Sequence, residues 1–105
     1  MKIGCDLTLI SRFKNKDKLA KKILSDDEYK SYILSSKRDE FLASRFALKE
    51  ALIKCLELSI LDVNLKEINT LKKESGAIYI SYNKKIYSCS LSHEGEYCMG
   101  VVIDA

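Results

Sequence analysis

The sequence predicts an α+β fold in which a mainly antiparallel sheet packs around one long central helix. Helical patterns occupy the first half of the chain and strand patterns the second, with one further strand at the N-terminus, a segregation typical of α+β domains. The longest run without a turn residue, Phe41–Leu56, is apolar over more than half of a helical circumference, as a buried helix should be. With 105 residues, no repeat and no linker, the chain is expected to form a single domain over residues 1–105.

The N-terminal segment Lys2–Thr8 alternates with a period of two, which predicts a half-buried strand. One face carries Ile3, Cys5 and Leu7, and the other carries Gly4, Asp6 and Thr8. Strands seldom carry aspartate, so Asp6 is either an exposed carboxylate on an edge strand or a functional group with space around it.

Two short helical regions precede the central helix. The chain is expected to turn helical through Leu9–Phe13 and the basic segment that follows. Ser25 and Glu28 have the spacing of a capping box, which predicts a helix ending near Leu34. After a break, the central helix is expected to begin near Asp39.

The central helix carries four charges that need an explanation. Arg45 and Lys49 lie about 40° apart inside the apolar arc, where an unpaired charge is costly. Glu50 and Lys54 share the remaining face, beside alanines that leave room for a neighbour. An ordinary i,i+4 ion pair and a snorkelling arginine are one reading, and an anion or metal site is the other.

The second half of the chain reads as strands. After a loop with helical turns at Leu58–Leu65, strands are expected at Glu67–Lys73, Ala77–Tyr82, Ile86–Ser92 and Tyr97–Ile103, the last of them central in the sheet. His93, the only histidine, is expected in the loop that closes the third of these strands.

Composition limits the class of partner. A net charge of +3 is too small to indicate a nucleic-acid-binding protein, but its distribution is uneven. Between positions 12 and 22 a single acid, Asp17, stands among six basic residues: Arg12, Lys14, Lys16, Lys18, Lys21 and Lys22. This segment is either a solvated loop or a docking face for an acidic partner.

The four cysteines show no C-x-x-C spacing and are expected to be small buried apolar residues. Together with the absence of a secretory signal, they favour a reducing, cytoplasmic location. No apolar run approaches the length of a membrane span, so no membrane partner is expected.

Three stretches carry a family resemblance: IGCDLTLISRF at the N-terminus, RFALKEALIK in the middle and CSLSHEGEYCMGVV near the end. Taken together, in this order, they resemble the holo-acyl-carrier-protein synthase family, the short type of 4′-phosphopantetheinyl transferase. K-E-A-x-x-K alone is a weak signal, but Gly-x-Asp before it and Ser-x-Ser-His after it make the combination specific.

The resemblance implies that family's fold and the transfer of the phosphopantetheine arm of coenzyme A to a serine of apo-acyl carrier protein, releasing adenosine 3′,5′-bisphosphate. Attack of an alcohol on a phosphoryl group depends mainly on positioning and charge neutralisation, and Mg²⁺ suits it. By resemblance, Asp6 and Glu50 hold Mg²⁺ and Lys54 reaches the same phosphates. The serine proton leaves either to Glu50 or to a metal-bound water.

The resemblance also implies binding residues and an assembly. Lys37, Arg38, Arg45 and His93 match positions that hold the nucleotide end of coenzyme A, including its 3′-phosphate. Arg12 and the lysines after it, Lys18 and Lys22 among them, match the helix that docks the acidic carrier protein. The family forms a homotrimer with active sites at subunit junctions, so Arg45 and Lys49 are expected to meet ligand phosphate or a neighbouring subunit.

The chain departs from the family pattern at three loops, one of which, between Arg12 and Leu19, is shorter than in the family. The stretch Glu57-Leu58-Ser59 stands where the family has a Gly-Thr-Gly-type loop, and Gly76-Ala77-Ile78 replaces Gly-Lys-Pro. Two alternatives therefore stand beside the transferase. One is a catalytically degenerate homologue, and the other is a non-enzymatic module that binds an acidic protein through the basic segment. The second gives no reason for two carboxylates, a lysine and a histidine to recur together.

Overall fold

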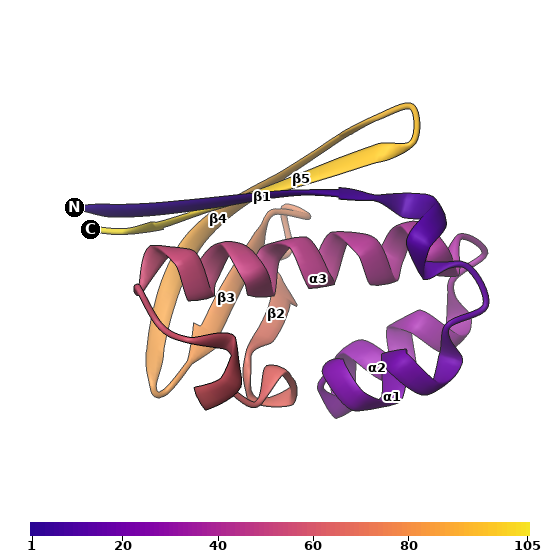
Figure 1. Cartoon of the computed structure of the whole chain (residues 1–105), viewed down its shortest axis with the longest axis horizontal. Helices are drawn as coiled ribbons and strands as arrows, with labels where there is room; N and C mark the ends of the chain where they lie inside the picture. The colour runs from indigo at the N-terminus through magenta and orange to yellow at the C-terminus, as the bar shows by residue number, and fades with distance from the viewer.

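A five-stranded antiparallel sheet, in the order β1-β5-β4-β3-β2, covers one side of the long helix α3 in a computed structural model that describes residues 1–105 (Figure 1). The strands are β1 (Lys2–Leu9), β2 (Asn69–Lys72), β3 (Ile78–Tyr82), β4 (Lys85–Glu94) and β5 (Tyr97–Asp104). The helices are α1 (Asp17–Ile23), α2 (Asp26–Leu34) and α3 (Arg38–Cys55), with 3₁₀ turns η1 (Ile10–Phe13), η2 (Ile60–Asp62) and η3 (Leu65–Glu67).

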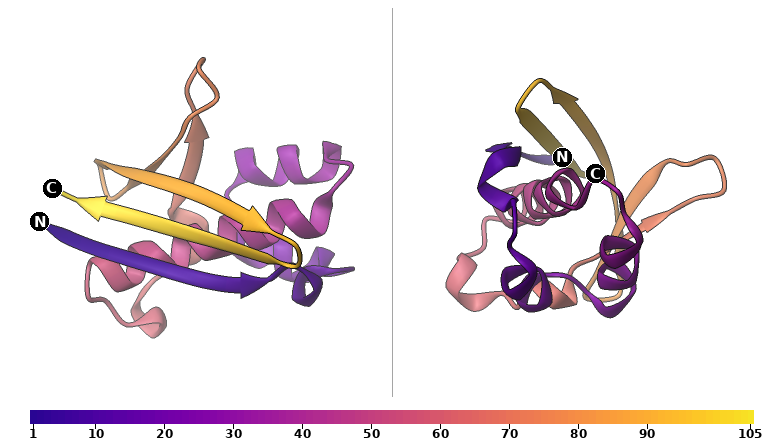
Figure 2. Two further views of the ribbon diagram at one scale, coloured as in Figure 1. Left: turned by 90° about the horizontal axis from the view of Figure 1, so that it is seen from above. Right: turned by 90° about the vertical axis from the view of Figure 1, so that its right-hand side faces the viewer.

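Helix α3 is the centre of the molecule. Seen end-on, it lies between the strands on one side and the pair α1 and α2 on the other (Figure 2). The predicted α+β class and the long central helix are confirmed. None of the helices combines the length and the apolarity that crossing a bilayer requires.

Local signals account for most helix boundaries. The capping box of α2 is complete, because the Glu28 amide donates to Ser25 Oγ at 3.2 Å and the Ser25 amide donates to Glu28 Oε1 at 2.7 Å. Strand β2 begins two residues later than predicted, since η3 occupies the preceding residues and the Asn64 side chain accepts from the Lys66 amide. His93 lies within β4 opposite Cys98, not in the loop predicted for it, because the turn beyond it is shorter than expected.

The face of β1 that packs on α3 is the polar one. Gly4 and, on β5, Gly100 lie so close to the helix that a Cβ built on Gly4 would collide with the carbonyl of Ala51. The helix meets these glycines with alanines, and Ala47 and Ala51 are fully buried. The strand is therefore half-buried as predicted, but its apolar face points outward.

Two side chains on that outward face, Ile3 and Leu7, are 66% and 63% exposed. Cys5 shares the face and is exposed, so the expectation that all four cysteines are buried is wrong for this one. The cause is the close approach of the β1 and α3 backbones, which only the glycine side of the strand permits.

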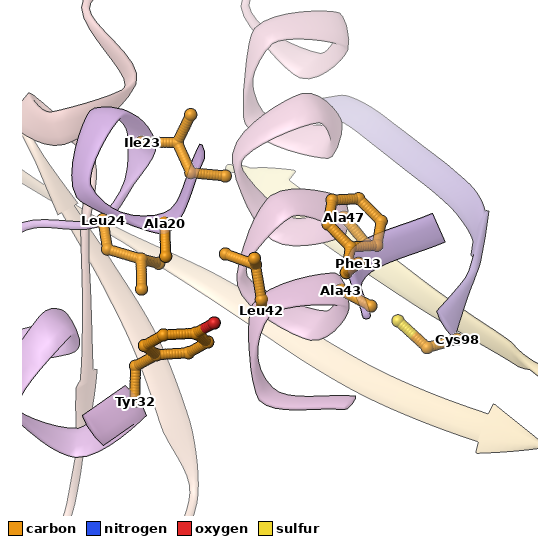
Figure 3. Packing of buried hydrophobic residues seen from close by; sticks show 9 residues of the cluster. All are labelled: Phe13, Ala20, Ile23, Leu24, Tyr32, Leu42, Ala43, Ala47 and Cys98. Carbon is orange, nitrogen blue, oxygen red and sulfur yellow. The ribbon is translucent and has the colours of Figure 1, made fainter. Parts of the chain in front are cut away.

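Two apolar clusters fill the interior, one toward each end of α3. Figure 3 shows the first, in which residues of α1, α2 and η1 gather around the N-terminal half of α3: Phe13, Ala20, Ile23, Leu24, Tyr32, Leu42, Ala43, Ala47 and Cys98. The second joins the C-terminal half of α3 to the sheet: Leu48, Ala51, Leu52, Ile53, Cys55, Ile68, Ile80, Tyr87 and Val102.

Lys49 is completely buried and is satisfied within its own chain. Its ammonium donates to Glu28 Oε1 at 2.6 Å, to the Ile23 carbonyl at 2.5 Å and to the Leu65 carbonyl at 2.9 Å. The expectation that Lys49 meets a ligand or a neighbouring subunit is therefore wrong. Its counter-ion is Glu28, 21 residues away, which the sequence identifies only as part of a capping box.

Candidate functional site

The two carboxylates predicted from sequence lie together where β1 crosses α3. Asp6 stands on the inner face of β1, and Glu50 and Lys54 lie on α3 one turn apart. Lys54 Nζ lies 3.0 Å from Asp6 Oδ1 and 3.1 Å from the Cys5 carbonyl. The lysine is half-exposed, so its head can leave Asp6 for another anion at small cost.

Glu50 is the unusual member of this group. Its Oε1 atom is buried and has no hydrogen-bond partner. Burial, followed by the neighbouring charge of Asp6, raises the pKa of Glu50, and Lys54 only partly opposes the shift. A buried, partnerless carboxylate oxygen beside a second carboxylate favours a bound cation or a proton.

The donor set fits Mg²⁺. This ion is held in proteins by one or two carboxylates and takes its remaining ligands from water and substrate phosphates. No group of three or more histidine, cysteine or acidic side chains that could hold a metal ion is present. Asp6 and Glu50 are the residues that would hold Mg²⁺ here.

Helix α3 ends with a left-handed backbone conformation that glycine usually adopts, but the residue there is Glu57. Glu57 has φ of 57°, in the left-handed region. The Leu58 amide donates to the Ile53 carbonyl at 3.0 Å and the Glu57 amide donates to the Lys54 carbonyl at 3.2 Å, which together make a Schellman motif. The loop therefore has the helix-ending geometry that glycine would supply, although its residue departs from the family pattern.

A second cluster lies at the other end of α3, around a pocket of about 270 Å³. Lys37, Arg45 and His93 line it, together with Glu40, Phe41, Ser44 and Lys72 among others. His93 Nε2 lies 3.4 Å from Glu40 Oε1. Three of the four predicted nucleotide-binding residues are thus together in one pocket.

The side chain of Arg45 is held in one orientation in this pocket. Its side chain is only 7% exposed, its guanidinium lies 4.3 Å from the centre of the Phe41 ring, and its NH1 donates to Ser44 Oγ at 2.8 Å. Its Nε has no partner. Burial lowers the pKa of Arg45 from its ordinary value, with Glu28 opposing the shift. An oriented guanidinium with a free donor suits an anion such as phosphate.

Arg38, the fourth predicted residue, lies apart from the pocket. It donates to the Ile33 carbonyl at 2.8 Å, lies over the Tyr32 ring, and is 4.0 Å from Asp17. It lines a separate hollow beside the start of α1.

The basic segment runs from η1, which directly follows β1, into α1, which lies on the side of α3 away from the sheet (Figure 1). Lys18 and Lys22 are exposed on α1. Arg12 is exposed on η1 and donates to Thr8 Oγ1 at 3.3 Å. Glu40 and Lys72 were not predicted as site residues, because their place in the pocket arises from long-range packing that no local pattern marks.

The two clusters face different sides of α3. Arg45 and Glu50 are five residues apart, which corresponds to about 140° around the helix and about 7.5 Å along it. The carboxylate cluster opens beside β1, whereas the pocket opens beside β4. In a single chain the carboxylate cluster and the pocket are therefore turned away from each other.

Comparison with known proteins gives one consistent family. The model of the 4′-phosphopantetheinyl transferase superfamily matches residues 2–102. A holo-[acyl-carrier-protein] synthase of Mycoplasma mobile is 40% identical over 102 residues, covering 96% of this chain and 86% of that protein. The same-named protein of Staphylococcus haemolyticus is 37% identical over 110 residues, covering 96% and 92%.

Solved structures agree with this result. The holo-(acyl-carrier-protein) synthase of Bacillus anthracis in complex with CoA (3′,5′-ADP) superposes with a TM-score of 0.87 at 28% identity, covering 96% of this chain and 92% of that one. The Helicobacter pylori holo-[acyl-carrier-protein] synthase in complex with coenzyme A gives 0.83 at 28% identity, covering 96% and 97%.

Proposed function

Because the chain belongs to the 4′-phosphopantetheinyl transferase superfamily, we propose that it transfers the 4′-phosphopantetheine arm of coenzyme A to a serine of apo-acyl carrier protein. The relatives named above carry this activity in their names, and two of the solved neighbours are complexes with coenzyme A or its 3′,5′-ADP portion. The observation that carries the proposal is the Asp6–Glu50–Lys54 cluster with its partnerless carboxylate oxygen.

Asp6, Glu50 and Lys54 have separate roles in the transfer. Asp6 and Glu50 would hold Mg²⁺, which would neutralise the charge of the bound pyrophosphate. Lys54, which pairs with Asp6 in the absence of ligand, binds the same phosphates. Glu50 accepts the proton of the attacking serine. Adenosine 3′,5′-bisphosphate is the leaving group.

The pocket takes the nucleotide end of coenzyme A. Arg45 and Lys37, which line the pocket, provide cationic groups for the 3′-phosphate, and His93 lies at the same rim. The aromatic ring of Phe41 and the side chain of Ile78 give the pocket apolar walls for a base. The pocket is small enough that further enclosure by a second chain would improve binding.

A homotrimer would bring the carboxylate cluster of one chain next to the pocket of another. Apolar side chains pair across the outward face of β1 and β5: Leu7 lies opposite Met99, and Leu9 lies opposite Tyr97. Leu7, Tyr97 and Met99 are 63%, 50% and 40% exposed. Contiguous apolar exposure of this kind marks an interface. Copies packed through this face would bring the carboxylates of one chain toward the pocket of the next.

The acceptor is an acidic carrier protein docked on α1, whose exposed lysines supply a positive surface. We place the reaction in the cytoplasm, where the four free thiols would stay reduced.

The proposal is tested by binding as well as by turnover. A ligand that binds only the native state at 100 times its Kd stabilises it by about 2.7 kcal/mol, so coenzyme A with Mg²⁺ is expected to raise Tm clearly. In Asp6→Asn, coenzyme A with Mg²⁺ is expected to raise Tm by less than in the wild-type protein. A Tm that coenzyme A and Mg²⁺ leave unchanged would contradict the transferase and favour a non-enzymatic module, whereas binding without transfer would favour the degenerate homologue.

A further inference from the structure

One fully buried charged group, the ammonium of Lys49, takes no part in the chemistry above. The ammonium of Lys49 uses its three protons on three separate segments: the last residue of α1 (Ile23), the first turn of α2 (Glu28) and η3 (Leu65). An ammonium has three donors and no more. The position of this one atom therefore fixes three segments relative to α3 at once.

Glu28 completes the arrangement from the other side. Its Oε1 accepts from Lys49 and from the Ser25 amide, and its Oε2 accepts from the amide and the hydroxyl of Thr70 on β2. Lys49 is 0% and Glu28 is 3% exposed. The positive charge lies at the C-terminal end of α1 and the negative charge at the N-terminal turn of α2, which is where each helix favours that sign.

Helix α1 is attached at both ends by polar contacts. At its start, Tyr32 Oη donates to Asp17 Oδ1 at 2.6 Å, which joins α1 to α2. At its end, the Ile23 carbonyl accepts from Lys49, which joins α1 to α3. Between these points the seam is apolar, with Ala20 and Leu42 in the same cluster (Figure 3). Apolar contacts are non-directional, so the polar contact to Lys49 sets where α1 lies along α3.

We propose that Lys49 and Glu28 are positioning residues that fix the basic helix α1 at a set distance from the catalytic carboxylate Glu50. Lys49 is the neighbour of Glu50 on α3, and the proposal rests on the proposed function of α1 as the docking face for the carrier protein. The bound carrier's serine is then presented to Glu50 because α1 and α3 share one buried ammonium.

Positioning of the docked carrier and electrostatic attraction of the carrier are expected to affect different kinetic constants. Removing the ion pair leaves Lys18 and Lys22 on the surface, so the encounter with the acidic carrier is unchanged and its KM stays within about threefold. The docked serine is displaced instead, and a displacement of about 1 Å can lower the rate roughly 100-fold. The effect is therefore expected in kcat and not in KM.

The experiment compares three variants at saturating coenzyme A. Lys49→Met leaves Glu28 buried without its counter-ion and is expected to unfold at a lower temperature. The double variant Glu28→Gln/Lys49→Met removes both charges and is expected to regain most of that loss, yet to keep a kcat reduced roughly 10- to 100-fold. Tyr32→Phe is the matched control, because α1 loses one hydrogen bond there but keeps its link to α3, and its kcat is expected to stay within about twofold.

Two readouts distinguish positioning from general stability. Coenzyme A binding by calorimetry is expected to be unchanged in the double variant, since the carboxylate cluster and the pocket are intact. Amide hydrogen exchange is expected to be faster in α1 and unchanged in the centre of α3. A double variant with wild-type kcat, or one that loses kcat and coenzyme A affinity in parallel, would overturn the proposal.

The exchange measurement does not depend on activity. If the wild-type protein transfers nothing, the proposed function fails, and exchange in α1 still decides whether the ion pair fixes this helix. Unchanged exchange in α1 would overturn the positioning role even where transfer is normal.

Discussion

Replacing Glu57 by glycine is expected to make the protein more stable. Glu57 ends α3 with φ of 57°, a conformation in which a β-carbon is crowded by its own backbone. Its side chain is exposed, and its one ion pair, with Lys2 at 3.3 Å, joins two side chains that are themselves largely exposed. Glycine removes the crowding and keeps both hydrogen bonds of the Schellman motif.

The magnitude follows from two opposing terms. A β-carbon in the left-handed region costs roughly 1–2 kcal/mol, and the extra freedom of glycine in the unfolded chain costs about 0.4–1 kcal/mol. The exposed pair with Lys2 contributes at most a few tenths. The free energy of unfolding is therefore expected to rise by about 0.5–1 kcal/mol, and Tm by roughly 3–6 °C for a domain of this size.

Thermal unfolding followed by circular dichroism measures the change directly. Glu57→Ala is the matched control: it removes the same charge but keeps the β-carbon, so its Tm is expected to stay the same or to fall slightly. If alanine raises Tm as much as glycine does, the effect belongs to the charge and not to the backbone. A lower Tm for Glu57→Gly would refute the strain argument.

Four further predictions concern the site, the docking face and the assembly. Asp6→Asn and Glu50→Gln are each expected to lower turnover roughly 100-fold or more, because the metal loses a ligand, and near-wild-type turnover in either would argue against the two-carboxylate site. Since the pKa of Glu50 is raised on folding, the folded chain binds a proton there more tightly than the unfolded chain. This carboxyl then opposes folding above its folded pKa, so Glu50→Gln is expected to raise the Tm of the metal-free protein at neutral pH, measured by calorimetry. Replacing Arg12, Lys18 and Lys22 by Glu is expected to raise KM for the carrier but not for coenzyme A. Added salt should also raise KM for the carrier, because the Debye length shrinks from about 10 Å at 0.1 M to about 3 Å at 1 M. Equal changes in both KM values would exclude docking on this segment. Light scattering at micromolar concentration is expected to show a trimer, and Leu7→Glu, on the outward face, a folded monomer; a fully active wild-type monomer would contradict the shared site.

The sequence predicted what local patterns encode. The long helix, the capping box at Ser25 and Glu28, and the strand periods all rest on neighbours within a few residues, and they are found where they were expected within about two residues. The family resemblance also predicted that Asp6 and Lys54 meet at one site, although they are 48 positions apart, but their direct ion pair was not predicted.

Contacts between distant segments account for the errors. An alternating strand normally buries its apolar face, and only the approach of Gly4 and Gly100 to α3 reverses this in β1. The partner of Lys49 is 21 residues away, and no periodicity connects the two residues. Arg38 follows Lys37 in sequence, but the start of α3 turns it toward Asp17 and away from the pocket.

The central claim is the transfer itself, and intact-mass spectrometry of the carrier tests it most directly. Apo-acyl carrier protein incubated with this protein, coenzyme A and Mg²⁺ is expected to gain the mass of one phosphopantetheine on a single serine. The gain should disappear when that serine is replaced by alanine or when the metal is chelated, and it should be strongly slowed in Glu50→Gln. A folded protein that binds coenzyme A and leaves apo-carriers of several sources unmodified would contradict the account.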